Sequence, residues 1–410
     1  MIVEKAPRMK ATKAVRFQYY PNEELIALFN TFKQMTNDAI GTAIQHKITS
    51  RFKLIKTAYQ DLKRYQLHTH YILSACEVAC AVIRNRKRRK TPYIQNPFLK
   101  LDNQAYKLEG KTIRIPKKPR QFIHIQLEMG DYQKKLLSDP NIKFGSVTIT
   151  PRNVVIAVSK DAASYEPEGL IGFDTNEASI DGAEICSNKV SFKSYSLSAV
   201  KTLKHTYYAK RRRVQRRFCN DRRKLRELQG KYRQNEKNRT EAVLHRVSKR
   251  IIDEVKSKKR GIVLEDLTNI RKEVNRKKNG INLFNGKEQK ISVNTKNMKR
   301  RLNTWTFKKL QHFIEYKAKW EGIPVSYVDP YYTSRRCPVC GCTVESNGHL
   351  TECKNCGLKM NRHLLAALNI LKTKDDTLRF RVDSSPSEAV IRSLSKAVSR
   401  RKEVHSTPEE

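Results

Sequence analysis

Long apolar runs are missing from this 410-residue chain, and its first residues, MIVEKAPRMK, contain no apolar signal region. The longest apolar candidate, residues 71–83, is too short to span a bilayer and contains Glu77. We therefore expect a core helix there and no membrane partner. The hydrophobic share of 38% is low but sufficient for folded cores, and the length predicts two or three domains.

Acidic residues are also scarce. Asp and Glu together number 40 against 84 Lys and Arg, which gives a formal net charge of +44. A surplus of one sign on this scale repels itself unless an anionic partner neutralises it. Nucleic acid suits this role best, because each phosphate contact also releases condensed counterions. An anionic membrane surface is the alternative, and the lack of apolar runs argues against it.

Cysteines are few, and their spacing is not that of a disulfide framework. Four of the nine form two Cys-x-x-Cys pairs separated by twelve residues: Cys337, Cys340, Cys353 and Cys356. Two such pairs on tight turns can hold Zn²⁺ in a closed tetrahedral site. Gly341 and Gly357, directly after the pairs, favour such turns. Two disulfides or four unrelated cysteines are the alternatives. A zinc site indicates a reducing, cytoplasmic compartment.

The first part of the chain predicts one strand, then helices, then several strands. Residues 10–20 alternate apolar and polar, residues 23–90 have a helical period over three or four helices, and residues 97–159 have a β pattern. Segments 146–150 and 154–158 predict a hairpin. This order favours a small β-barrel that contains the helices as an insertion. The basic run that ends the helices is either a nucleic-acid contact or a solvated helix end.

A second domain is expected to begin near Gly169 with three strands. The next region, 196–260, is helical and carries 23 Lys and Arg against 6 Asp and Glu. Its last part has an apolar stripe that predicts packing on a sheet. The rest has little apolar face, which indicates nucleic-acid contact or else a solvated hairpin. The candidate contacts are Arg211, Arg212, Arg213, Arg216, Arg217, Arg222 and Arg223.

The remaining segments alternate between buried and polar stretches. Residues 261–267 predict a buried strand, and the Gly-, Asn- and Lys-rich residues 268–297 predict a mobile loop. One helix around 302–314 and a strand at 323–328 precede the cysteines. The polar tail from about residue 373 is expected to be poorly ordered.

Two carboxylates stand at the ends of apolar strands, Asp174 after Leu170–Phe173 and Glu265 after Gly261–Leu264. Side chains at the ends of adjacent strands can converge. Two converging carboxylates form a hard-oxygen site for Mg²⁺, which can promote phosphodiester hydrolysis. Ordinary strand-end acids are the alternative for either residue alone.

Several motifs together resemble the TnpB/OrfB family, which is encoded by bacterial and archaeal transposons and related to type V CRISPR effectors. The resemblance covers most of the chain and rests on Ile171–Asp174, Ile262–Leu267, Val328–Ser334, the four-cysteine module and Ala366–Ile370. It implies an RNA-guided DNA endonuclease that binds a guide RNA and a double-stranded DNA target. A transposase that joins strands itself is disfavoured, because the sequence has no His-hydrophobic-His motif with a nucleophilic tyrosine.

The resemblance also implies a multidomain α+β and α/β architecture. An N-terminal wedge β-barrel would hold a helical recognition insertion, and a RuvC-like domain of RNase H fold would hold a zinc-ribbon insertion. The expected bounds are 1–22 and 93–165 for the barrel, 23–92 for the helices, 166–334 and 358–372 for the RuvC-like domain, 335–357 for the zinc module and 373–410 for the tail. In this family a lid over the active site follows the second acid, so we hypothesise that residues 268–297 form such a lid.

Carried over by position, Asp174 and Glu265 are the first two catalytic carboxylates. The third belongs to a pattern like Asp-Arg-Asp-x-Asn-Ala-Ala, for which this chain has Asn361-Arg362-His363-Leu364-Leu365-Ala366-Ala367. Both aspartates are absent, and His363 occupies the expected catalytic position.

Three interpretations stay open at this point. In the first, His363 ligates the metal, helped by the Asn361 carbonyl, and Mn²⁺ is favoured over Mg²⁺ because imidazole is the softer ligand. In the second, another acid reaches the site, from among Asp329, Asp375 and Asp376. In the third, cleavage is lost and the protein is an RNA-guided DNA-binding transcriptional repressor. The retained carboxylates favour weak or altered nuclease activity.

Overall fold

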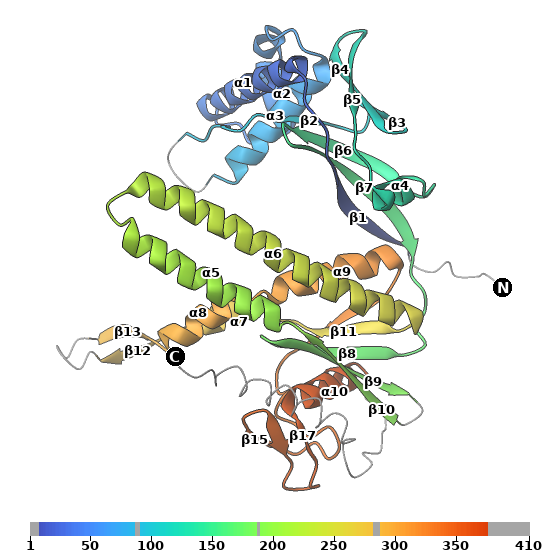
Figure 1. Ribbon diagram of the computed structural model, residues 1–410, viewed down its shortest axis with the longest axis vertical. Helices are drawn as coiled ribbons and strands as arrows, with labels where there is room; N and C mark the ends of the chain where they lie inside the picture. The colour runs from blue at the N-terminus through green and yellow to red at the C-terminus, as the bar shows by residue number, and fades with distance from the viewer. Residues whose placement is uncertain (1–7, 87–90, 187–188, 282–287, 376–410) are drawn as a thin grey trace, which may run out of the picture. The chain divides into compact units, whose positions relative to one another are not determined.

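The computed structural model describes residues 8–86, 91–186, 189–281 and 288–375 (Figure 1). Two compact units divide the chain. Residues Lys10–Ala162 form an N-terminal unit, apart from those outside the described ranges, and the described residues between Ala163 and Asp375 form a C-terminal unit together with Arg8 and Met9. Over the described ranges, no helix combines the length and apolar character needed to cross a membrane.

The N-terminal unit contains a bundle of three helices, α1 (Glu23–Gln45), α2 (Arg51–Lys63) and α3 (Thr69–Arg84). The side chain of Asn22 caps α1 by accepting a hydrogen bond from the backbone of Leu25. Fully buried aromatic side chains fill the space between the helices. The expected three or four helices are thus three. Most of the basic run after α3, residues 87–90, lies outside the described part of the chain.

The strands of this unit form two open sheets. A four-stranded sheet has the order β1-β7-β6-β2, and a three-stranded sheet has the order β3-β4-β5. Their bounds are β1 Arg8–Phe17, β2 Leu99–Leu101, β3 Lys107–Glu109, β4 Thr112–Lys118, β5 Gln121–Gln126, β6 Lys143–Thr150 and β7 Asn153–Ala163, with the short helix α4 at Asp131–Leu137. The predicted hairpin is β6–β7, closed by the pair Thr150 and Asn153.

The predicted closed barrel is not found among the described strands. A single bridge between Gln18 and Glu128 links the strand that precedes the helices to the residues that follow β5. The opposite edge of the four-stranded sheet is β2, which has only three residues. Barrel closure needs a continuous ladder between edge strands, so one bridge and one short edge strand leave the sheets open.

The C-terminal unit is built on a five-stranded mixed sheet with the order β10-β9-β8-β11-β14. The first three strands form the predicted antiparallel meander, while β11 is parallel to both β8 and β14. Their bounds are β8 Leu170–Thr175, β9 Ser179–Cys186, β10 Lys189–Ser196, β11 Gly261–Glu265 and β14 Val325–Val328. Parallel strands buried on both faces need helices on both sides.

Helices cover both faces of this sheet. On one face, Ile171, Phe173, Ile262 and Leu264 share a core with the apolar stripe of α6 (Arg222–Ser257) and with α9 (Phe307–Glu321). On the other face lies α10 (Arg362–Lys374), whose backbone closely approaches Gly172 of β8. The basic region is a hairpin of α5 (Ser198–Arg217) and α6, as Figure 1 shows.

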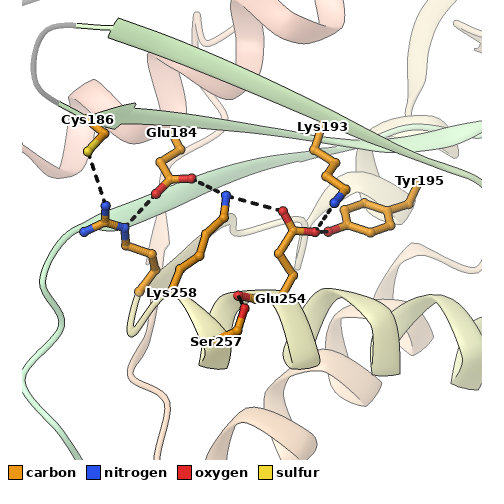
Figure 2. A network of polar contacts seen from close by, with 8 residues as sticks. Glu184, Cys186, Lys193, Tyr195, Glu254, Ser257 and Lys258 are labelled. Carbon is orange, nitrogen blue, oxygen red and sulfur yellow. Dashed lines mark hydrogen bonds and ion pairs between the residues drawn. The ribbon is translucent and has the colours of Figure 1, made fainter.

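Ion pairs fasten the end of α6 to the sheet (Figure 2). Glu184 of β9 accepts hydrogen bonds from Lys258 at 2.7 Å and from Arg260 at 2.6 Å. Glu254 of α6 contacts Lys193 at 2.6 Å and accepts a hydrogen bond from the hydroxyl of Tyr195 at 2.5 Å. Burial opposes ionisation of Glu184, but its two cations hold the pKa below the usual value.

Two expectations for residues 268–314 were wrong. The predicted mobile loop contains α7 (Ile270–Val274) and a hairpin of β12 (Lys277–Ile281) and β13 (Glu288–Ser292). These strands are almost wholly exposed, so they lack the apolar alternation by which a strand is recognised. The lid role of this stretch stays a hypothesis.

The helix expected around 302–314 is in fact two helices, α8 (Lys296–Thr304) and α9. Trp305 between them is extended, and its indole N–H donates to the backbone oxygen of Asn176 at 3.1 Å. This tertiary hydrogen bond accounts for the break. The expected tail begins after α10, and residues 376–410 lie outside the described part of the chain.

Candidate active site and zinc site

Asp174 is the last residue but one of β8, and Glu265 is the last residue of the neighbouring parallel strand β11. Phe173 pairs with Leu264, so the next residue on each strand is an acid. Both carboxylates lie on the face of the sheet that α10 covers, because side chains alternate along a strand and Gly172 faces that helix. Each residue is only 7% exposed. The predicted convergence of these acids follows from the strand register.

Glu265 has an environment that disfavours its charge. Burial, followed by the charge of Asp174, raises the pKa of Glu265 to about 7, against the lowering effect of a hydrogen bond from Thr333. The Thr333 hydroxyl donates to Glu265 Oε1 at 2.6 Å. Asn369 of α10 donates to the backbone oxygen of Thr333 at 2.7 Å. The hydrogen bond from Thr333 therefore fixes the orientation of the Glu265 carboxylate. A bound cation would relieve the repulsion between Glu265 and Asp174.

His363 lies at the third corner of this site. Asn361 caps α10 by accepting a hydrogen bond from the backbone N–H of His363 at 2.9 Å. The cap sets the start of the helix so that His363 Nδ1 lies 3.1 Å from Asp174 Oδ2. The imidazole is mostly buried, with 16% of the side chain exposed. Residues 189 positions apart thus meet, as the position of His363 in the sequence pattern predicted.

A further carboxylate, Asp181, belongs to this group and was not predicted. It stands on β9 directly opposite Asp174 and is 5% exposed. The side-chain amide of Asn176 donates to both Asp174 Oδ2 and Asp181 Oδ2, each at 2.9 Å, and Ser179 donates to Asp181 at 2.7 Å. The signal in the sequence was an acid between apolar neighbours, Ile180-Asp181-Gly182-Ala183, although the same strand carries a second acid, Glu184.

The acids that the sequence offered as substitutes lie elsewhere. Asp329 is exposed and accepts a hydrogen bond from the backbone of Tyr331 in a local turn. Asp375 follows the far end of α10, twelve residues after His363, which corresponds to about 18 Å of helix. Asp376 lies outside the described residues. Among the described acids, Asp181 is the one placed beside Asp174.

These donor types suit a divalent cation. In the described part of the chain, however, the ligand atoms of three or more such residues come within 4.8 Å of one another at the four cysteines and not at these residues, so the carboxylates and the imidazole would have to draw closer around an ion. Carboxylate oxygens are the ligands that Mg²⁺ prefers, and an imidazole nitrogen shifts the preference towards Mn²⁺. The group holds three carboxylates, from Asp174, Asp181 and Glu265, and one imidazole. Their neighbours in the hydrogen-bond network are amide and hydroxyl groups, which orient the ligands and leave the negative charge in place.

The four predicted zinc ligands are brought together. The sulfur atoms of Cys337, Cys340, Cys353 and Cys356 all lie within 4.8 Å of one another. The backbone N–H of Gly341 donates to Cys337 and that of Gly357 to Cys353, and both glycines have positive φ, at 75° and 72°. Glycine adopts this conformation without strain. The cluster can bind zinc, and the alternative of two disulfides finds no support in this grouping.

The zinc module contains three short strands, the last of which leads to the candidate active site. They are β15 (Glu345–Asn347), β16 (Leu350–Glu352) and β17 (Lys359–Asn361), paired in this order. β17 ends at Asn361, which caps α10. The module therefore positions the start of the helix that carries His363.

The seven candidate arginines of α5 and α6 differ in exposure. Arg211 forms an ion pair with the buried Glu236, so its charge is already engaged. The other six are exposed: Arg212, Arg213, Arg216, Arg217, Arg222 and Arg223. They form a cationic surface at the turn of the helical hairpin.

Comparison with known proteins gives matches along most of the chain. A family described as Cas12f1-like, TNB domain, matches residues 307–370, and one described as Uncharacterized protein MJ0013 family matches residues 28–116. TnpB-like protein MJ0751 of Methanocaldococcus jannaschii is 36% identical over 70% of this chain and 99% of its own length.

Parts of the chain are also similar to CRISPR-associated proteins. The CRISPR-associated endodeoxyribonuclease Cas12f1 of Sulfoacidibacillus thermotolerans is 34% identical over 31% of this chain and 25% of its own length. A cryo-EM structure of a Cas12f1–sgRNA–target DNA complex has a TM-score of 0.51 at 14% identity, covering 86% of this chain and 84% of that one. At this identity the likeness shows a shared fold.

Proposed function

Because this chain belongs to the family of TnpB-like proteins, we propose that it is an RNA-guided DNA endonuclease with a RuvC-like, metal-dependent active site. The observation that carries this proposal is the contact of 3.1 Å between His363 Nδ1 and Asp174 Oδ2. This contact supports the proposal that His363 of α10 stands at the corner where the family has its third acid.

The fold supports this assignment. An antiparallel meander followed by two parallel strands, with helices on both faces, is consistent with a RuvC-like domain of RNase H fold. The four-cysteine module, inserted between β14 and α10, corresponds to the zinc ribbon. We assign the N-terminal unit to the wedge and recognition parts of the family, with two open sheets and three helices.

Asp174, Asp181, Glu265 and His363 would hold the divalent ion, with Mn²⁺ favoured over Mg²⁺ by the imidazole. When bound, such an ion supplies water activation and charge stabilisation at the leaving oxygen of a phosphodiester. Thr333 orients Glu265, and Asn176 holds the two aspartates in register. These contacts fix the ligands before the substrate arrives, which reduces the reorganisation needed for catalysis.

The proposed partners are a guide RNA and a double-stranded DNA target. The charge of +44 supports phosphate contacts over a large surface. The six exposed arginines of the α5–α6 hairpin are the proposed contacts, whereas Arg211 stabilises the hairpin through Glu236.

Cleavage of a matched plasmid by the purified guide-loaded complex tests the proposal. Wild type is expected to cut in Mn²⁺ and more weakly in Mg²⁺, and Asp174→Ala to abolish cutting while target binding is retained. His363→Asp restores the carboxylate of the family and should improve cutting in Mg²⁺.

One outcome favours the repressor instead. If wild type binds its target without cutting in either metal and His363→Asp alone cuts, the protein is a nuclease-inactive DNA-binding relative. The observation that favours this second function is the absence of both expected aspartates, which Asn361 and His363 replace.

A further inference from the structure

A small cavity lies between α5 and the residues around the α8–α9 break. Its volume is about 170 Å³. Aromatic and basic side chains line it, notably Tyr208, Trp305, Lys201, Lys204, Arg300 and Arg301. A cavity of about 150 Å³ accommodates one benzene-sized ring, whereas drug-sized ligands need roughly 300–1,000 Å³. The volume therefore suits a single flat ring and excludes a whole nucleotide triphosphate or a folded cofactor.

This cavity and the proposed active site share one turn of the chain. The turn joins β8 to β9, and its residue Asn176 makes both connections. The backbone oxygen of Asn176 accepts from the indole of Trp305, at 3.1 Å, while its side-chain amide donates to Asp174 and Asp181. The next residue, Glu177, lines the cavity. A group held in the cavity is thus next to the end of the strand that carries the first catalytic acid.

The lining combines stacking surfaces with cations at their edges. Four basic side chains line the cavity, from Lys201, Lys204, Arg300 and Arg301. Arg301 and Lys201 form ion pairs with Glu177, at 2.6 Å and 3.8 Å, and Lys204 forms one with Glu236 at 2.8 Å, whereas Arg300 has no ion pair within the described residues. The guanidinium of Arg300 lies 4.5 Å from the centre of the Tyr208 ring. Aromatic rings bordered by Arg and Lys are typical of sites that hold unpaired bases, because the rings stack on the base and the cations contact its phosphates.

We infer that this cavity binds one unpaired base of the single-stranded DNA segment that is to be cut. Resting on the proposed function, the inference identifies how the substrate strand is held beside the carboxylates. Tyr208 and Trp305 provide the stacking surface, and Arg300 contacts a neighbouring phosphate. Recognition by stacking does not discriminate strongly between bases, so the position of the base along the strand matters more than its identity.

Fluorescence of 2-aminopurine in the DNA strand tests the inference in the guide-loaded complex. The measurement uses EDTA, so that binding is separate from cleavage. One position along the displaced strand should show strong quenching on binding. Tyr208→Ala and Trp305→Ala should each remove this quenching and weaken single-strand binding about tenfold. Trp305→Phe keeps an aromatic ring and should retain most of the quenching.

The matched control is Tyr327→Ala, which removes a partly exposed aromatic side chain of the same unit that does not line the cavity. It should behave as wild type. The inference is overturned if Tyr208→Ala and Trp305→Ala quench and bind as wild type does. It is equally overturned if 2-aminopurine is quenched only when placed in the guide RNA. A complex that shows the quenching but never cleaves DNA would refute the proposed nuclease function, while the inference that the cavity binds a base would still hold.

Discussion

Substituting Gly172 by alanine is predicted to loosen the contact between α10 and the sheet. A Cβ atom at position 172 would meet the backbone oxygen of Ala367 at 2.6 Å and the backbone nitrogen of Leu371 at 2.8 Å. Both are backbone atoms of α10, so no side-chain rotation can relieve the overlap. Moving the oxygen from 2.6 Å to the 3.4 Å of ordinary contact requires the helix to shift by about 0.8 Å.

The expected cost in stability is about 2 kcal/mol, within the range of roughly 1–3 kcal/mol for overpacking a tight core. For a unit of about 200 residues this corresponds to a fall of about 4–8 °C in the melting temperature. Thermal unfolding followed by circular dichroism measures it. Gly230→Ala is the matched control, because its Cβ would meet nothing within 4 Å and it lies inside α6. This control should gain about 0.5–1 kcal/mol from helix propensity.

The same substitution should affect the site more than the stability alone implies. A shift of α10 away from β8 separates His363 from Asp174, which are 3.1 Å apart in the native site. At 25 °C, where Gly172→Ala is still folded, we therefore expect weaker Mn²⁺ binding and slower cleavage than in wild type. A variant as stable as wild type, with unchanged metal affinity, would refute the close packing of α10 on Gly172.

The structure also predicts the sign of the effect of three further substitutions on stability or zinc binding. Burial, and then the charge of a neighbouring lysine, lowers the pKa of Lys317 to about 8, so the folded state disfavours its charge at neutral pH. Lys317→Met should raise the free energy of unfolding at pH 7 by about 1 kcal/mol, a value already discounted for the partial exposure of Lys317 and for its lost hydrogen bonds. This gain should vanish as the pH rises from about 8 to 10.5. Thermal melts measure it, with the exposed Lys308→Met as a control that should not change stability. Glu184→Gln should lower the free energy of unfolding, measured with urea at pH 7, by about 1.5–3 kcal/mol, because the charged hydrogen bond to Arg260 is lost. Since the pKa of Glu184 is lowered in the folded state, the difference in stability between the variant and wild type should fade as the pH falls below about 4.5. Cys353→Ser should reduce bound zinc from about one per chain to near zero by metal analysis of protein purified under reducing conditions, and full retention of zinc would contradict the four-sulfur site.

Local signals in the sequence were enough to predict that Asp174 and Glu265 stand near the ends of apolar strands and that the four cysteines gather. Asp174 and Glu265 follow short apolar runs, and strand register alone brings them together. The cysteine pairs carry their own turn signal in Gly341 and Gly357, whose positive φ the structure confirms. Such features depend on a few neighbouring residues, so they can be predicted from the sequence before the fold is known.

Features that depend on tertiary contacts were missed or wrong. Asp181 lies beside Asp174 only because β9 pairs with β8 in a particular register, and the sequence of β9, which carries both Asp181 and Glu184, does not show which acid lies there. The break at Trp305 depends on a hydrogen bond to Asn176, which is 129 positions away. The expected barrel required edge strands to pair over a long distance, and the described strands share one bridge there.

Mn²⁺ binding by the purified protein, measured by electron paramagnetic resonance of the free ion, tests the central claim most directly. The claim is that Asp174, Asp181, Glu265 and His363 form one divalent-metal site. Wild type should bind Mn²⁺, Asp174→Ala should lose this binding, and His363→Ala should weaken it at least about tenfold. Identical binding curves for wild type and Asp174→Ala would contradict the account.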